Sequence, residues 1–235
     1  MHLLLSAYSC DPARGSEPGI GWRWCLEYAR AGHGVELLTF QRSPEPLRKA
    51  IGEAGLSERI TVHVPPMPAW VNALYRRGPI IYLHYAIWQV YAFFAARRIV
   101  SRRQIDFAQH LTMTTLASPT WLWRLPVPFV FGPVGGGEVA PPNVLADLPA
   151  AMRAGEWLRR LWSWSMTTCN PLFRAGCRRA ALLVAVTTQS QSRFPRRHCG
   201  KSLVVSSVGL DAVGMSDSVA GWNHRTDDPG PLRIL

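Results

Sequence analysis

Residues 6–24 read SAYSCDPARGSEPGIGWRW and connect a short apolar run to a segment with a helical pattern. The apolar run, Leu3–Leu5, predicts a buried strand. The helical segment extends to Ala31, and Pro18 suits its first turn, because the first N–H groups of a helix have no partner within it. A strand, a glycine loop and a helix N-terminus in this order are typical of a ligand site in doubly wound α/β domains.

Gly15, Ser16, Glu17 and Gly19 are the candidate binding residues of this loop. The two glycines let the backbone approach a ligand without a Cβ in the way. Ser16 or Glu17 can cap the free amides of the helix, or the Glu17 carboxylate can accept hydrogen bonds from sugar hydroxyls. A carboxylate here competes with a bound phosphate, and the spacing matches neither a dinucleotide-binding fingerprint nor a P-loop.

The chain carries a strong excess of positive charge. Its 235 residues include 26 Lys or Arg and 15 Asp or Glu, which gives a formal net charge of +11. Such a surface suits an anionic membrane, a phosphorylated partner or nucleic acid, and it is equally compatible with a solvated surface that has no partner. The basic residues are scattered and no nucleic-acid module is visible, so we expect a membrane or phosphate partner and no nucleic acid.

The cysteine pattern and the N-terminus predict a cytoplasmic protein. The five cysteines are odd in number and include no CxxC pair, which favours reduced thiols over a disulfide framework or a metal site. The N-terminus lacks the basic region and the long apolar run of a signal peptide. We therefore expect no metal site and no secretion.

Seven apolar segments predict strands, and helical patterns separate most of them. This alternation predicts an α/β fold, namely a Rossmann-like, doubly wound and mainly parallel sheet. The expected strands are His2–Ser6, Val35–Thr39, Ile60–Val64, Ile105–His110, Phe129–Phe131, Ala181–Val186 and Ser202–Ser206. The expected helices are Gly19–Ala31, Pro44–Ala54, Pro79–Ala96, Thr115–Trp123, Ala150–Trp164, Pro171–Ala180 and Gln189–Phe194.

Two of these helical segments, Pro79–Ala96 and Ala150–Trp164, are rich in aromatic residues, and a third, Pro171–Ala180, carries one aromatic residue, Phe173. Pro79–Ala96 has no charged residue and is just long enough for a membrane span, but His84 and Gln89 favour a buried or interfacial helix. Ala150–Trp164 mixes three tryptophans with arginines, and Pro171–Ala180 carries Phe173 among three arginines. That mixture fits peripheral contact with an anionic membrane, on its inner face. It fits equally an ordinary amphipathic helix whose arginines extend past apolar neighbours.

Two further candidate sites follow later strands. His110 ends the fourth expected strand, at the edge where doubly wound sheets bind ligands. Residues 132–138 read GPVGGGE and follow the fifth expected strand, so their backbone must turn tightly or meet a ligand. We expect this loop, the 15–19 loop and His110 to meet at one rim of the sheet. The candidate binding residues of the second loop are Gly135, Gly136, Gly137 and Glu138.

The chain divides into a domain, a linker and the start of a second domain. Residues 1–210 contain all seven expected strands. Residues 211–231 are polar and contain Gly, Pro and Asp, which is typical of a linker. Residues 232–235 read LRIL and look like the opening of another buried strand. A strand start with nothing after it cannot build a domain, so we expect a truncated second domain.

Several motifs occur together in one order: GSEPGIGW at 15–22, the histidine at 110, FGPVGGGE at 131–138, VAVTT at 184–188, SVGLD at 207–211 and LRIL at 232–235. In this order they resemble the N-terminal half of a family 4 glycosyltransferase with the GT-B fold. The resemblance covers nearly the whole chain. It implies two Rossmann-like domains that face each other across a cleft. It also implies transfer of a sugar from a nucleotide-sugar donor to an acceptor hydroxyl, with retention, without a metal and without a cofactor besides the donor.

The same resemblance implies roles for the candidate residues. The N-terminal domain would hold the acceptor, a glycan or a lipid-linked glycan. Gly15–Gly19 would approach the donor phosphates or the acceptor, and His110, the catalytic candidate, would lie near the transferred sugar. Gly135–Glu138 would line the cleft, with Glu138 as a ligand of sugar hydroxyls. The family's diphosphate-binding pair belongs to the second domain, so we expect no appreciable turnover from this chain alone.

A function from another class remains open. The chain can instead be a non-catalytic Rossmann-like module that binds a phosphorylated metabolite. A hydrolase is disfavoured, because the sequence contains no GxSxG elbow and no carboxylate pair at the spacing that glycoside hydrolysis needs.

Overall fold

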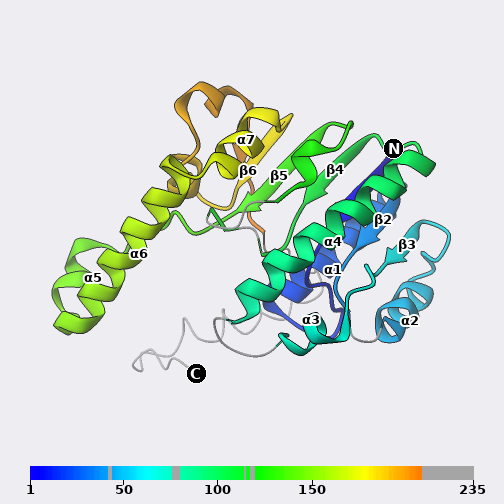
Figure 1. The fold of residues 1–235 in the computed structure, drawn as a ribbon, viewed down its shortest axis with the longest axis horizontal. Helices are drawn as coiled ribbons and strands as arrows, with labels where there is room; N and C mark the ends of the chain where they lie inside the picture. Colours follow the sequence, from blue (N-terminus) through cyan, green and yellow to red (C-terminus); the bar gives the residue numbers. More distant parts are fainter. Residues whose placement is uncertain (42–43, 76–79, 114, 117–119, 208–235) are drawn as a thin grey trace, which may run out of the picture.

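The computed structural model describes residues 1–41, 44–75, 80–113, 115–116 and 120–207 (Figure 1). The expected linker, 211–231, and the expected start of a second domain, 232–235, lie outside these residues. The strands are β1 (His2–Ser6), β2 (Gly34–Leu38), β3 (Ile60–His63), β4 (Phe107–His110), β5 (Phe129–Val134), β6 (Leu182–Ala185) and β7 (Ser202–Val204). The helices are α1 (Ser16–Arg30), α2 (Glu45–Glu53), α3 (Ala69–Ala73), α4 (Ile80–Arg102), α5 (Pro142–Ala146), α6 (Ala150–Thr168), α7 (Pro171–Arg179) and α8 (Thr188–Gln191), with 3₁₀ turns η1 (Leu122–Arg124) and η2 (Arg196–Lys201).

The strands form one seven-stranded sheet in the order β3-β2-β1-β4-β5-β6-β7. Every neighbouring pair is parallel; Leu3 of β1, for example, is in register with Val35 of β2 and Phe107 of β4. The order reverses between β1 and β4, as in doubly wound dinucleotide-binding folds. The fold is therefore Rossmann-like α/β, which confirms the expected class.

Alternate residues along the strands face two apolar cores. Leu4 of β1 belongs to the core under α4 and α7, which includes Trp88 and Phe173. Leu3 and Leu5 belong to the core under α1 and α2. All these side chains are almost fully buried, and each such burial contributes about 2 kcal/mol to stability. Figure 1 shows α4 crossing in front of the strands, with α1 behind it.

Some expected boundaries were wrong. No α-helix covers 115–123 in the described residues: Thr115 forms a parallel bridge to Gly135, and only the short turn η1 follows. The pairing with a neighbouring strand end competes with helix formation, and Pro119 in the sequence removes a helical hydrogen bond. The helix that begins near residue 80 continues to Arg102, six residues beyond its expected end. Strand β5 extends to Val134, so the glycine loop begins at Gly135.

None of the described helices combines the length and the apolarity that crossing a bilayer requires. Although α4 has 23 residues, it carries three arginines and buries His84 and Gln89 against the sheet.

Candidate functional site

The two predicted loops follow β1 and β5, and His110 is the last residue of β4. These three strands are adjacent and parallel in the sheet. The carboxyl ends of parallel strands lie at one edge of a sheet. Hydrogen bonds join the loops along this edge. The Glu17 carboxylate accepts from the Met113 N–H at 2.8 Å, and the Leu116 N–H donates to the Gly135 carbonyl at 3.1 Å. The segment after β4 therefore connects the first turn of α1 to the glycine loop, so both loops lie at one rim, as expected.

Glu17 holds the first loop to its neighbour instead of capping its own helix. Helix α1 has no side-chain cap at its N-terminus, where Gly15 is the N-cap residue and is exposed. Burial raises the pKa of the Glu17 carboxyl above its usual value, and the hydrogen bond from Met113 offsets part of that rise. Ser16 is exposed with φ of 55°, and Gly19 is buried where a Cβ would lie 2.5 Å from the Arg14 carbonyl oxygen.

Glu138 closes the glycine loop onto the N-terminal end of α8. One carboxylate oxygen accepts from the hydroxyls of Thr187 and Ser190, both at 2.7 Å, and the other accepts from the Gly136 N–H at 2.8 Å. Burial alone would raise the pKa of the Glu138 carboxyl, but these hydrogen bonds outweigh it and hold that pKa below its usual value. Both oxygens are thus engaged within the protein, and contact with a sugar hydroxyl stays a prediction.

The geometry explains two of the three consecutive glycines. Gly136 has a φ of +92°, a backbone conformation that residues other than glycine rarely adopt. At Gly137 a Cβ would lie 2.6 Å from Ser190 Cα, so only glycine permits this approach of the loop to α8. The Gly137 N–H donates to Ser190 Oγ at 3.1 Å. Gly135 forms the bridge to Thr115 described above.

Replacing Glu138 with Gln tests the role of this carboxylate. A carboxyl whose pKa is lowered by folding stabilises the native state above its unfolded pKa, and that contribution is lost as the pH falls through the folded pKa. We expect Glu138→Gln to cost about 1–2 kcal/mol at pH 7 and much less at pH 3, measured by urea unfolding across this range. The exposed Glu53→Gln should cost little at either pH. An equal cost of Glu138→Gln at both pH values would contradict this role.

His110 is completely buried behind Tyr85 and stacks on Phe131. Its Nε2 lies 2.9 Å from the Tyr85 hydroxyl, and burial lowers the pKa of its imidazole to about 3. The ring is therefore neutral near pH 7. Gln89 donates to the Tyr85 oxygen at 2.5 Å and accepts from Thr120 at 3.2 Å. His110 thus reaches the rim through Tyr85, and its expected contact with the transferred sugar stays a prediction.

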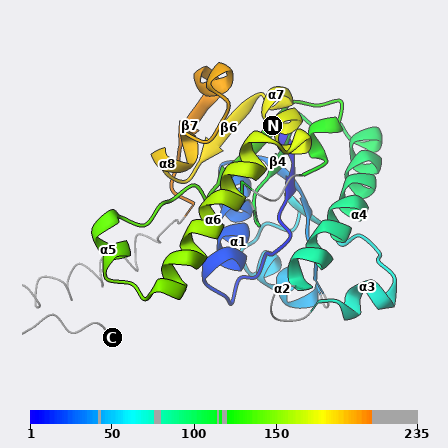
Figure 2. The same cartoon turned by 60° about the vertical axis from the view of Figure 1, so that its left-hand side comes forward.

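A cavity of about 750 Å³ opens at this rim between α4, α6 and the glycine loop. Figures 1 and 2 show α4 and α6 running in a similar direction at this side of the sheet. Aromatic side chains and polar groups share the lining, and the buried Tyr85 and Gln89 form part of it. Of the predicted site residues, only Gly136 lines this cavity. Lining residues include Tyr85, Gln89, Gly136, Arg159, Trp162 and Ser163.

Helix α6 is attached to the glycine loop by its polar side chains. The Ser163 hydroxyl donates to the Gly136 carbonyl at 3.2 Å, and Arg159 donates to the Glu138 carbonyl at 2.6 Å. Sequence reasoning did not assign Tyr85, Gln89 or Ser163 to the site. Tyr85 and Gln89 lie four residues apart in an otherwise apolar helix, a spacing that places both on one face and that was available as a signal.

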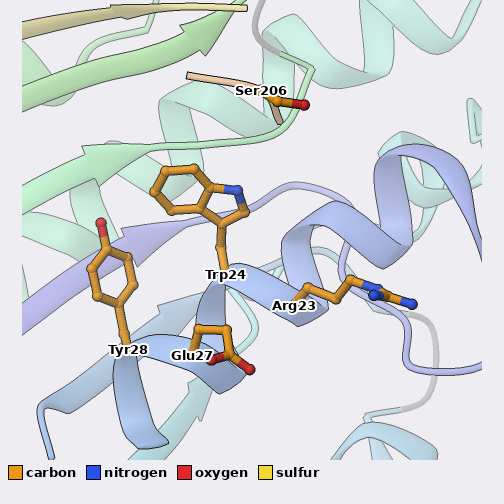
Figure 3. A pocket seen from close by; sticks show the side chains of 5 residues that line it. All are labelled: Arg23, Trp24, Glu27, Tyr28 and Ser206. Atoms are coloured by element: carbon orange, nitrogen blue, oxygen red, sulfur yellow. The ribbon is translucent and has the colours of Figure 1, made fainter. Parts of the chain in front are cut away.

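Smaller cavities lie elsewhere among the residues that the structure describes. One of about 160 Å³ lies beside the β1 loop, next to Tyr8, Arg14 and Pro18. Another, of about 360 Å³, lies along α1, from which Trp24 and Tyr28 extend toward the segment that carries Ser206 (Figure 3). No predicted site residue lines either cavity. We therefore take the cavity between α4 and α6 as the candidate site.

The described residues include no group of three or more His, Cys, Asp or Glu side chains that could hold a metal ion. All five cysteines are free thiols: Cys10, Cys25 and Cys177 are buried, whereas Cys169 and Cys199 are exposed.

No protein-family model and no curated protein matches the chain. Among solved structures, it is similar to the glycosyltransferase SnogD from Streptomyces nogalater, with TM-score 0.40, 15% identity, and coverage of 89% of this chain and 52% of that chain. It is also similar to the bulky-bulky ketone specific alcohol dehydrogenase from Comamonas testosteroni, with TM-score 0.32, 8% identity, and coverage of 100% and 97%. The chain spans about half the length of SnogD. Similarities this weak carry no argument about activity.

Proposed function

We propose that residues 1–210 are the acceptor-side domain of a glycosyltransferase that uses a nucleotide-sugar donor. The supporting observation is the cavity between α4, α6 and the glycine loop. Sugars present apolar ring faces, which pack on aromatic side chains, and hydroxyls, which need hydrogen-bonding partners. Tyr85, Trp162 and Ser163 supply both kinds of group at the carboxyl edge of the sheet.

In this proposal the acceptor hydroxyl lies at the inner end of the cavity, near Tyr85. Its oxygen attacks the anomeric carbon of the donor, the bond from that carbon to the diphosphate oxygen breaks, and the departing diphosphate takes up the proton of the acceptor hydroxyl. His110 and Gln89 fix the Tyr85 hydroxyl from two sides, so His110 acts as a positioning residue. The acceptor is a glycan, free or lipid-linked. The diphosphate's charge needs basic groups that the resemblance assigns to a second domain.

Ligand binding by the 235-residue chain tests this proposal. We expect octyl β-glucoside, below its micellar concentration, to bind in the cavity and to raise the melting temperature. Trp162→Ala removes an aromatic wall, and Tyr85→Phe removes a hydroxyl. Each should weaken binding about tenfold, which corresponds to about 1.4 kcal/mol. Trp70→Ala, at an exposed tryptophan of α3 outside the cavity, should leave the affinity unchanged.

The same assay separates the proposal from its alternative. Stabilisation by glucose 6-phosphate or inorganic phosphate alone, without any glucoside binding, would contradict the acceptor role. That result would favour the non-catalytic module for phosphorylated metabolites. Sugar transfer from a panel of nucleotide sugars should be undetectable for this chain alone, and full turnover by it would also contradict the proposal.

A further inference from the structure

Helix α6 exposes its apolar face and buries its polar one. Trp157, Leu161 and Trp164 are spaced i, i+4 and i+7, so they share one face, and they are 63%, 44% and 52% exposed. The buried residues of α6 are Ser163 and Thr167. An amphipathic helix of a globular protein normally turns its apolar stripe to the core. Here the stripe is turned away from the sheet, because Ser163 bonds to the glycine loop.

Helix α4 carries a second exposed apolar stripe. Leu83, Val90 and Phe94 are 54%, 43% and 55% exposed, and their spacing places them on one side of the helix. The opposite side of α4 buries Trp88 and Ala92 in the core. A helix that is apolar all round is ordinarily enclosed by protein or lipid. The mouth of the cavity lies between α4 and α6, so apolar side chains flank it on both helices.

The charges on these two helices are almost all positive. Together α4 and α6 contain six arginines and one acidic residue, Glu156. Two copies of this face would therefore repel each other, which disfavours self-association. Tryptophans beside arginines match the interfacial region of an anionic bilayer, where indoles lie at headgroup level and arginines meet lipid phosphates.

Helix α7 provides a contrast within the same chain. Its Phe173 is buried in the core, and its exposed residues are Pro171 at its first position and the three arginines Arg174, Arg178 and Arg179. It is an ordinary amphipathic helix. The sequence alone favoured neither membrane contact nor an ordinary amphipathic helix for these two segments. The structure distinguishes them, because the apolar face is turned inward on α7 and outward on α6.

We propose that the outer faces of α4 and α6 form a docking surface for an anionic membrane, with the cavity opening within it. Docking would seat the exposed aromatic and aliphatic side chains at headgroup depth. Figure 1 shows α6 leading away from the sheet toward α5, so this helix can reach a planar surface. The proposal concerns the surface itself and holds whatever the cavity binds.

Vesicle sedimentation of the 235-residue chain tests the docking surface. We expect binding to vesicles of phosphatidylcholine with 30% phosphatidylglycerol, weak binding to phosphatidylcholine alone, and a loss of binding as salt is raised. Tryptophan fluorescence should shift to the blue and be quenched by brominated lipid. The double variant Trp157→Glu/Leu161→Glu should bind roughly tenfold more weakly. Neither residue lines the cavity, so glucoside binding should not change.

A matched control carries the same change of charge. Leu203→Glu/Val204→Glu replaces two exposed apolar residues of β7, which are 39% and 40% exposed, and it should bind vesicles as the unmodified chain does. Equal losses in both double variants would mean that net charge alone drives binding, which would overturn the proposal. The proposal would also be overturned if binding did not depend on phosphatidylglycerol. It would be overturned as well if the unmodified chain were a dimer that Trp157→Glu/Leu161→Glu converts to a monomer.

Discussion

Gly21→Ala should destabilise the protein by about 3 kcal/mol, although alanine favours a helix more than glycine does. Gly21 lies in α1 where the helix meets the loop after β1. A Cβ there would be less than 3.0 Å from the Ser9 carbonyl oxygen, and 3.2 Å from Thr112 Cγ2. Neither the Ser9 backbone nor the Thr112 methyl group can yield easily, because Thr112 Oγ1 also accepts the Ser9 N–H at 3.0 Å. The helix would have to move away from the rim.

Gly155→Ala is the matched control. Gly155 lies within α6, and nothing lies within 4 Å of a Cβ placed on it. Because no clash arises, the substitution changes only the helix propensity, which is higher for alanine than for glycine. It should therefore stabilise the protein by about 1 kcal/mol at most. Urea unfolding measures both changes. If both substitutions changed the free energy of unfolding in the same direction, α1 would not pack against the loop after β1 as closely as described. Gly21→Ala should also weaken glucoside binding, because the rim shifts with α1.

Arg103→Met should cost about 2 kcal/mol, the second largest effect. Glu36 of β2 is fully buried, and its carboxylate lies 2.8 Å from Arg103, 2.9 Å from His2 and 2.5 Å from His63. A buried carboxylate that loses a cationic partner keeps its desolvation penalty. The cost stays below that of a fully buried pair, because the Arg103 side chain is itself 50% exposed.

Two further variants check that this effect comes from Glu36. Arg102, the residue before Arg103, is exposed, so Arg102→Met should change stability by less than about 0.5 kcal/mol. Glu36→Leu/Arg103→Met removes the buried charge together with its partner, and it should recover part of the loss. Thermal or urea unfolding gives all three values. A loss for Arg103→Met no larger than that for Arg102→Met would exclude the buried pair as a source of stability.

The helical and strand patterns were predictable because they depend on neighbours in the chain. The alternation of Leu3, Leu4 and Leu5 between two cores follows from strand geometry alone. The expected helix at 115–123 failed because Thr115 pairs with Gly135, a residue of another strand end. The sequence also could not predict which face of α6 is turned toward the sheet. Periodicity identifies an apolar face, but it does not say whether that face meets the core.

The sequence by itself determined the order of the seven strands along the chain, the glycine-bearing loops after the first and fifth strands, and the excess of arginine, since each is a local or summed property of the chain. Only the tertiary structure decided the partners of the polar groups. Glu17 bonds to Met113, and Glu138 to Ser190. These pairs lie far apart in the chain, and the sheet brings them together by placing β1 beside β4 and β5 beside β6. A hydrogen bond requires a separation near 3 Å, which local preferences cannot specify across such distances.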